Sequence, residues 1–304
     1  MSKSSEDTKW YAYTSSTQTM RTWARRIDTF AEVPPVFQAA FPPHSPHDPF
    51  PSTIYLPEDR LSKAHLRNDQ LVCLFADHFV LLERQRDEIV TRAADFADVL
   101  YIQRGLVLLN SWLKIRTSAE EFELPFNTTV EYLFDPLVDT LRRAGMGVSA
   151  YGEVPGAKMK PDLSRFDFLE TVNYKFMNYG RSSIHSSDKI LGLIYQPDET
   201  LHSLRFFNRV VYHQYKTAHL TVLTDHELVL IQEAKAIRNN FDSSYGGVFT
   251  YIPRRQIQEV SFTPPPQAAD AAWQMDVVLA SDVHLAVEFS ASNESLPSFQ
   301  ALWN

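Results

Sequence analysis

The sequence contains a single cysteine, Cys73, among 304 residues. One cysteine excludes an intrachain disulfide and a zinc site built on several thiolates. Cys73 lies within an apolar stretch that is predicted to be a strand. A buried structural thiol is therefore expected, since a reactive thiolate needs a neighbouring base or cation.

Long apolar segments are also missing. No run of about 18 apolar residues occurs, so no transmembrane helix is expected. The first thirty residues carry charges and hydroxyl groups throughout, and they contain no apolar core typical of a signal peptide. These observations predict a cytoplasmic protein.

The chain has no excess of positive charge. Lys and Arg number 29 against 37 Asp and Glu, which gives a formal net charge of −8, and both halves of the chain are acidic. Nucleic-acid binding depends on Lys and Arg that neutralise phosphates, so no nucleic-acid partner is expected. The same balance disfavours a membrane surface as partner, although a local basic patch stays open.

Familiar catalytic motifs are missing as well. The sequence has no P-loop, no Gly-rich dinucleotide turn, no G-x-S-x-G and no H-E-x-x-H. We therefore expect no cofactor, no bound metal and no catalytic residue.

What the chain does contain is a repeated hairpin. Leu220–Ile231 (L-T-V-L-T-D-H-E-L-V-L-I) predicts two strands joined at Thr224-Asp225-His226. Val72–Glu83 (V-C-L-F-A-D-H-F-V-L-L-E) repeats the pattern with the same Asp-His at the turn. Aspartate suits such a turn through bonds to its own backbone, so a turn role is favoured for both Asp-His pairs over catalysis.

Further matches occur in the same order in both halves, with offsets that only rise. They are Ile54–Asp59 with Ile194–Glu199 at an offset of 140, Asp77-His78 with Asp225-His226 at 148, Tyr101–Arg104 with Tyr251–Arg254 at 150, and Phe126 with Phe289 at 163. This order predicts a tandem duplication. We expect residues 1–145 to hold an N-terminal helix, a proline-rich segment and the first unit, 146–161 a linker, and 162–304 a helical segment and the second unit.

Helical spacing marks two further elements. Met20, Trp23, Ile27 and Phe30 predict an amphipathic helix that begins near Ser16, ahead of a proline-rich extended segment at 34–57. Apolar residues from 133 to 141 predict a second helix. Its start has two readings, since either Asn127 or Thr128 caps a helix that Pro136 kinks, or Asp135 caps a shorter helix with Pro136 at its first position.

Each unit is thus a run of antiparallel strands followed by a helix. Such a sheet must curl to cover its faces, which predicts a β-rich α+β fold of two small barrels or sandwiches, each closed by a C-terminal helix. Leu220–Ile231, Val248–Val260 and Val283–Ser290 resemble the hairpin, next strand pair and last strand of the bacterial pleckstrin-homology-like domains. The resemblance covers residues 65–144 and 210–304 and implies two tandem copies. Eukaryotic relatives bind phosphoinositides through basic residues in the first hairpin loop, but Thr224-Asp225-His226 has none.

Three groups of residues are candidate sites. His44, His47 and Asp48 are too few ligands for a metal centre. Arg205, Arg209 and Lys216 would form an anion-binding patch if residues 197–208 were helical. Phe241 and Tyr245, in the Gly- and Asn-rich stretch 239–247, could contact a partner.

We therefore expect a non-enzymatic binding or scaffolding protein whose ligand is a protein or peptide, held by an edge strand or by the 239–247 loop. The alternative is an anionic-ligand or membrane-surface binder that uses Arg205, Arg209 and Lys216. An enzyme of unrecognised type is the third possibility. The sequence makes no prediction of oligomeric state.

Overall fold

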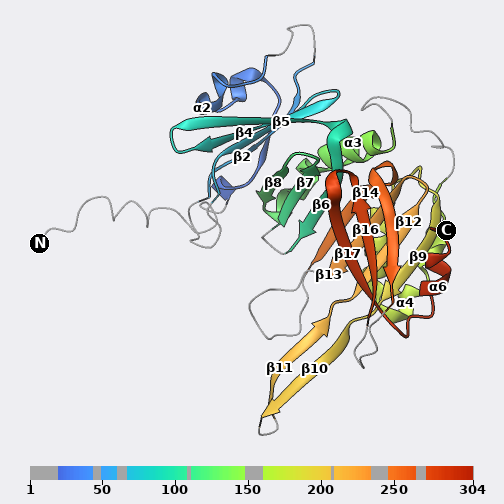
Figure 1. Ribbon diagram of the computed structural model, residues 1–304. Helices are drawn as coiled ribbons and strands as arrows, with labels where there is room; N and C mark the ends of the chain where they lie inside the picture. Colours follow the sequence, from blue (N-terminus) through green and yellow to red (C-terminus); the bar gives the residue numbers. More distant parts are fainter. Residues whose placement is uncertain are drawn as a thin grey trace, which may run out of the picture.

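The computed structural model describes residues 20–43, 49–59, 67–107, 111–147, 160–206, 209–233, 246–264 and 272–303, with the backbone alone for 200–206 and 209–216. Its strands form sheets of seven, five, three and two strands, and every strand pair in this part of the chain is antiparallel (Figure 1). The predicted β-rich α+β class is confirmed. None of these sheets closes into a barrel within the described residues.

The central element is the seven-stranded sheet, which contains strands from both halves of the chain. Its order is β8 (Glu121–Phe126), β7 (Ser111–Thr117), β6 (Val99–Leu106), β14 (Gly247–Pro253), β13 (Glu227–Glu233), β12 (His219–Thr224) and β9 (Ile190–Gln196). The two halves meet where β6 pairs with β14.

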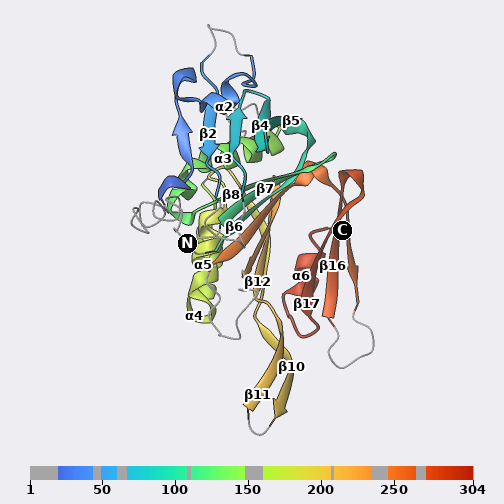
Figure 2. The ribbon, with the colours of Figure 1, turned by 90° about the vertical axis from the view of Figure 1, so that its left-hand side faces the viewer.

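Both faces of this sheet are covered in its C-terminal part. Helices α3 (Asp135–Gly145) and α5 (Tyr174–Ser183) lie on one face, and the three-stranded sheet of β15 (Ile257–Thr263), β16 (Ala272–Leu279) and β17 (Val283–Ser290) lies on the other (Figure 2). Successive strand residues point to opposite faces. Leu228 and Leu230 accordingly join the cluster under the small sheet, while Val229 and Ile231 join the cluster under the helices. Burial on both sides explains why β13 is apolar without alternation.

A second sheet lies beside the first and holds most of the N-terminal half. Its five strands, in spatial order, are β1 (Arg25–Ile27), β2 (Ser52–Leu56), β3 (Gln70–Leu74), β4 (His78–Gln85) and β5 (Glu88–Asp95). The hairpin of β10 (Glu199–Phe206) and β11 (Arg209–Lys216) pairs only with itself among the described residues and extends away from the body (Figures 1 and 2).

The remaining elements are short. They are the α-helices α2 (Pro35–Gln38), α4 (Leu169–Val172) and α6 (Leu296–Gln300) and the 3-10 helices η2 (Phe30–Glu32), η3 (Phe96–Asp98), η4 (Thr128–Leu133), η5 (Leu163–Phe166), η6 (Arg254–Gln256) and η7 (Ala280–Asp282). No helix in the described ranges is long and apolar enough to cross a membrane.

Helix α3 shows how Pro136 is used. Asn127 caps η4, where its side chain accepts a hydrogen bond from the Thr129 amide at 3.0 Å. The chain leaves helical geometry at Val130. Helix α3 then begins with Pro136 in its first turn and carries Arg142 and Arg143 in its last turn. Pro136 therefore starts a short helix, and the Asn127 cap belongs to a separate 3-10 turn.

The same order of elements occurs twice. Four strands, a 3-10 turn, three strands and a helix run from β2 to α3, and the same series runs from β9 through β12–β17 to α6, with β10 and β11 inserted. Strand registers give the equivalences. The Leu74–Phe79 pair of β3–β4 corresponds to Leu223–Leu228 of β12–β13 at an offset of 149 (223 − 74 and 228 − 79). The expected repetition of strand order is thus present in the described residues.

Two of the predicted matches are wrong in detail. At the offset of 149, His226 takes the place of Asp77, so the two Asp-His pairs lie in equivalent turns but one residue out of step. Tyr101–Arg104 lies on β6 and Tyr251–Pro253 on β14, and these strands are not equivalents but hydrogen-bonded neighbours, with Tyr251 opposite Ile102. Strands that face each other in one sheet share its apolar pattern, which explains their likeness.

The predicted N-terminal helix is wrong within the described residues. Arg25–Ile27 forms strand β1, whose residues pair with Thr53–Tyr55 of β2. Trp23 and Ile27 both pack into apolar clusters. Their spacing, which predicted a helix, therefore comes from a turn followed by a strand. The expected linker at 146–161 falls mostly on residues 148–159, outside the described residues.

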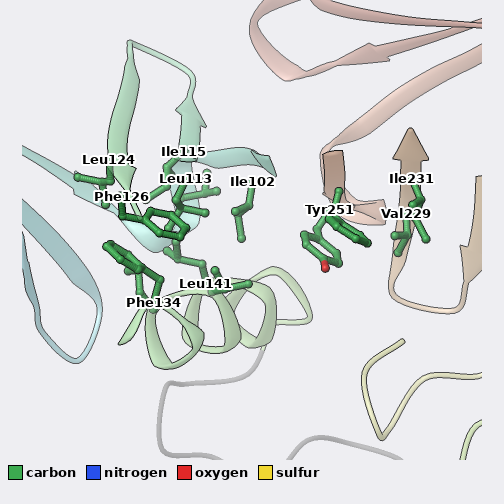
Figure 3. Packing of buried hydrophobic residues seen from close by; sticks show 14 of the residues in the cluster. Ile102, Leu113, Ile115, Leu124, Phe126, Phe134, Leu141, Val229, Ile231 and Tyr251 are labelled. Carbon is green, nitrogen blue, oxygen red and sulfur yellow. The ribbon is translucent and has the colours of Figure 1, made fainter. Parts of the chain in front are cut away.

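The apolar core crosses the junction of the two halves. Figure 3 shows Phe134 and Leu141 beside Phe126 and Leu113 on one side, with Tyr251 and Val229 on the other. Phe126 and Phe134 stack with ring centroids 4.2 Å apart. One continuous cluster joins β6–β8, α3, α5 and β12–β14. The halves are therefore held together by shared core as well as by paired strands.

Candidate functional site

The β6–β14 junction is the place where one sheet accepts a strand from another part of the chain. Five residue pairs join the two strands, from Gly247 opposite Leu106 to Tyr251 opposite Ile102. The side-chain amide of Gln103 also donates a hydrogen bond through Nε2 to the Thr250 hydroxyl at 3.2 Å. Strand addition of this kind takes its affinity from main-chain hydrogen bonds and its specificity from the side chains.

A buried ion pair secures this junction. Arg142 of α3 donates through Nε to Glu227 Oε2 at 3.2 Å and through Nη2 to Glu227 Oε1 and to the Ser183 carbonyl, the latter at 2.8 Å. The side chains are 10% and 4% exposed. The Arg142 guanidinium also lies over the Tyr251 ring of β14, 4.2 Å from its centroid. Burial alone would lower the pKa of Arg142, but Glu227, Tyr251 and Asp188 together outweigh it, so the pKa is raised and the charge is retained.

Asp188 lies next to this pair and is buried. Burial raises the pKa of its carboxyl to about 6, and the neighbouring Glu227 charge acts in the same direction against Arg142 and His185. His226 Nδ1 lies 3.2 Å from Asp188 Oδ1 and 3.1 Å from Asp225 Oδ1. Asp188 Oδ2 has no hydrogen-bond partner among the described residues. The group is thus a charged cluster with an uncompensated carboxylate oxygen inside the protein.

Among the described residues, Asp188, Asp225 and His226 form the group that could hold a metal. One ligand atom from each lies within 4.8 Å of the others. His226 Nδ1 already contacts both Asp188 Oδ1 and Asp225 Oδ1, and Asp225 Oδ1 also accepts from the Lys189 amide at 2.8 Å. Three ligands are fewer than the four of a structural zinc site, so the geometry is that of a hydrogen-bonded turn.

The Thr224-Asp225-His226 turn is shaped by a buried hydroxyl. Thr224 Oγ1 accepts from the amides of His226 at 3.2 Å and Glu227 at 3.0 Å, and it donates to the Glu227 carbonyl at 3.1 Å. The predicted turn role of the Asp-His pair is consistent with this arrangement. In the other hairpin His78 stacks on Phe75 with centroids 4.6 Å apart, and its hydrogen bond to Asp77 lowers the pKa of that exposed carboxyl.

The predicted anion patch is not formed. Arg205 and Arg209 lie on strands β10 and β11 rather than on a helix, close to the hairpin tip, where Phe206 pairs with Arg209. Lys216 lies at the opposite end, paired with Glu199, seven residues along the strand from Arg209. At about 3.3 Å per residue, roughly 23 Å of strand separate the two backbones. Because the strand register separates them, the three residues do not form one site.

The other predicted site residues lie outside the described residues. This holds for Phe241 and Tyr245 in the 239–247 stretch and for His44, His47 and Asp48. Arg142, Glu227 and Asp188 were not singled out by sequence. Glu227 follows the Thr224-Asp225-His226 turn directly, and Arg142 is one of two arginines at the end of the predicted helix. Nothing in the sequence indicates that these two residues lie together in the fold.

A hollow of about 620 Å³ lies between the five-stranded sheet and β8. Its basic residues are engaged by the protein itself. Arg67 donates to the carbonyls of Thr22, Pro57 and Pro125 at 2.6–2.9 Å, and burial lowers the pKa of this guanidinium. Arg92 binds Glu120 at 3.0 Å. These bonds tie the N-terminal segment to β8 and give the hollow a structural role.

In the described part of the chain, six strands end one of the three larger sheets, namely β1, β5, β8, β9, β15 and β17. Of these, β5 ends the five-stranded sheet and β15 ends the three-stranded sheet. Neither contains a fully buried residue, whereas six of the seven residues of β14 are buried. Exposed edges of this kind present backbone N–H and C=O groups with which another strand can pair.

Comparison with protein-family models, with curated proteins and with solved structures found no match to this chain.

Proposed function

We propose that this protein is a non-enzymatic binding or scaffolding protein that takes an extended segment of a partner protein onto the open edge of β15. The observation that carries the proposal is the β6–β14 pair. Strand β6 begins at Val99, directly after η3, and β15 begins at Ile257, directly after η6, so the two strands occupy the same place in the repeated order. Strand β6 holds an added strand, and β15 has the same edge open among the described residues.

The proposed architecture is two tandem pleckstrin-homology-like units, residues 1–145 and 162–304, joined by a linker at 146–161. The order of four strands, three strands and a closing helix, found twice, supports it. Packing of the β15–β17 sheet against β9 and β12–β14 also supports a bent two-sheet unit. Related phosphotyrosine-binding-type domains accept peptides as an added strand, which is the binding mode proposed for β15.

The chemistry of β15 suits an added strand. Its sequence I-Q-E-V-S-F-T contains β-branched and aromatic residues, and Val260 and Phe262 are half-buried rather than covered. An incoming strand would gain main-chain hydrogen bonds along the edge and apolar contact with these two side chains. Glu259 is exposed and would favour a partner strand that is not acidic at the facing position.

A peptide with the sequence of β14, labelled with a fluorophore, tests the edge directly. Fluorescence anisotropy should show saturable binding to the intact chain, because β14 is the strand that pairs with the equivalent β6. Val260→Pro and Ser261→Pro are the diagnostic variants. The N–H groups of adjacent strand residues point to opposite edges, so one proline blocks the outer edge and the other breaks the pairing with β16. The variant that keeps the wild-type melting temperature should lose the peptide, and unchanged binding by that variant would reject the proposal.

A further inference from the structure

The repeated order identifies two pairs of equivalent strands. In the first pair, Phe79 faces Ala94 across β4–β5 and Leu228 faces Ile252 across β13–β14, so β5 corresponds to β14 at an offset of 158 (252 − 94). In the second pair, β6 begins at Val99 and β15 at Ile257, which is again an offset of 158. Within the chain, β14 adds to β6. Their counterparts β5 and β15 each have an outer edge that no other strand covers in the described residues.

We propose that β5 of one copy of this chain adds to β15 of a second copy, in the way that β14 adds to β6 within the chain. This inference rests on the proposed function and names its partner. Carrying the internal register over by 158 residues places Ala93 opposite Val260, Arg92 opposite Ser261, Thr91 opposite Phe262 and Val90 opposite Thr263. The paired strands are antiparallel.

The residues at these positions are compatible with pairing. Thr91 opposite Phe262 is a β-branched residue facing an aromatic ring, and Val90 opposite Thr263 joins two β-branched residues. No two like charges face each other in the four pairs. Arg92 keeps its bonds to Glu120 and Glu83 on its own chain and faces only the Ser261 hydroxyl across the junction.

The junction between copies is weaker than the one within the chain. Inside the chain α3 supplies Arg142 to Glu227, but α6 takes the place of α3 in the second unit and contains no arginine in Leu296–Gln300. His78 takes the place of Glu227 at the offset of 149. We therefore expect association that depends on concentration. Since the two edges differ, the contact is head-to-tail and produces a ring or an open series of chains.

Cysteine pairing tests the register. The two variants are Ala93→Cys and Val260→Cys, and opposite Cα atoms in an antiparallel pair lie about 4.5–5.5 Å apart, within disulfide range. The native Cys73 is buried, which raises the pKa of its thiol to about 12 and keeps it out of the reaction. Under a mild oxidant, a mixture of the two variants should give a disulfide-linked dimer on a non-reducing gel. Each variant alone should give at least tenfold less.

The matched control replaces Val260→Cys by Ser261→Cys, which turns the thiol to the other side of the strand. Mixed with Ala93→Cys it should give little dimer. Equal dimer from both mixtures would overturn the proposed register. The variant that carries Ala93→Cys and Val260→Cys together should form a series of higher species or a closed ring of few chains.

Sedimentation velocity separates this inference from the proposed function. A chain that sediments as a monomer from 1 to 200 μM and gives no cross-link, while it still binds the β14 peptide, rejects self-association and leaves the binding edge standing. Loss of both peptide binding and association would reject the edge as an interaction site. Association that survives the edge-blocking proline would place the contact elsewhere and also overturn the inference.

Discussion

Arg142 and Glu227 form a buried ion pair although they lie in different halves of the chain, one on helix α3 and the other on strand β13. The pair stands beside the β6–β14 junction, and the Tyr251 ring of β14 covers the guanidinium. It thus connects a helix of the N-terminal half of the chain to a hairpin of the C-terminal half. The contribution of this pair to the stability of the protein can be compared with that of an exposed pair in the same chain.

Removing the acid of the buried pair should be costly. Glu227→Gln leaves a buried guanidinium without the carboxylate that it is bonded to, and we expect the free energy of unfolding to fall by about 3–5 kcal/mol. The control is Asp167→Asn, which breaks the Arg181–Asp167 pair at the surface and should cost at most about 1 kcal/mol. Urea denaturation measures both. Equal costs for the two variants would show that the buried pair is not special.

The contribution of Asp188 to the free energy of unfolding should fall as pH rises from 4 to 6. The pKa of Asp188 is raised to about 6 in the folded protein, so the folded state holds a proton there that the unfolded state has already lost. The stability from this group is present at the low end of that range and is lost as pH passes through 6, by up to about 3 kcal/mol at 1.36 kcal/mol per pKa unit. Asp188→Asn removes the titration.

The comparison uses urea curves for wild type and Asp188→Asn at pH 4.5 and 7.5. The difference in unfolding free energy between the two proteins should change across this interval in favour of the variant at the higher pH. A constant difference would mean that Asp188 keeps the same pKa in both states. Asp139, whose pKa is lowered by its hydrogen bond with His185, acts at the acid end and cancels in the comparison.

Two threonines of strand β12 should respond in opposite ways to loss of the hydroxyl. Thr224→Val removes the acceptor for two turn amides in a buried site and should cost about 1–3 kcal/mol. Thr221 Oγ1 is buried and makes no hydrogen bond within the described residues. Thr221→Val should therefore be neutral or stabilising by up to about 1 kcal/mol. Thermal unfolding followed by circular dichroism distinguishes the two, and a loss at Thr221 as large as at Thr224 would contradict the assignment.

Gly180 should be sensitive although it lies within a helix. A Cβ placed there would lie 2.6 Å from the Phe166 ring of η5. Alanine normally favours a helix over glycine by about 1 kcal/mol. Here we expect Gly180→Ala to destabilise by about 1–3 kcal/mol through overpacking. The exposed Asn178 on the same helix is the control, since Asn178→Ala should stabilise slightly. A stabilising Gly180→Ala would show that Phe166 can move aside.

Strand patterns explain how much of the fold could be predicted. Phe122, Leu124 and Phe126 alternate with more exposed residues on an observed strand, and both hairpins lie where the repeated Asp-His turn placed them. These features are local, because a period of two or a turn residue acts within a few positions. The 3-10 turn capped by Asn127 and the helix with Pro136 in its first turn were also among the local readings, because a cap and a proline act on the residues next to them.

The predictions that were wrong concern segments whose structure depends on residues far away in the sequence. Residues 25–27 are extended because β2 offers them backbone hydrogen bonds, and their own spacing gives no sign of it. Residues 199–206 form a strand because β11 pairs with them, which separates Arg205 from Lys216. The β6–β14 junction joins residues 141 to 149 positions apart (247 − 106 and 251 − 102) and was misread as a repeat because the paired strands look alike.

That separation has a consequence for synthesis on the ribosome. At about 5–20 residues per second, β14 emerges roughly 7–30 s after the residues of β6 that it will cover. During this interval the N-terminal half exposes a long apolar strand edge, which is the kind of surface that promotes misassociation of nascent chains. A pause or truncation between residues 107 and 246 should therefore yield products that depend on chaperones, whereas the finished chain shields that edge with its own later strand.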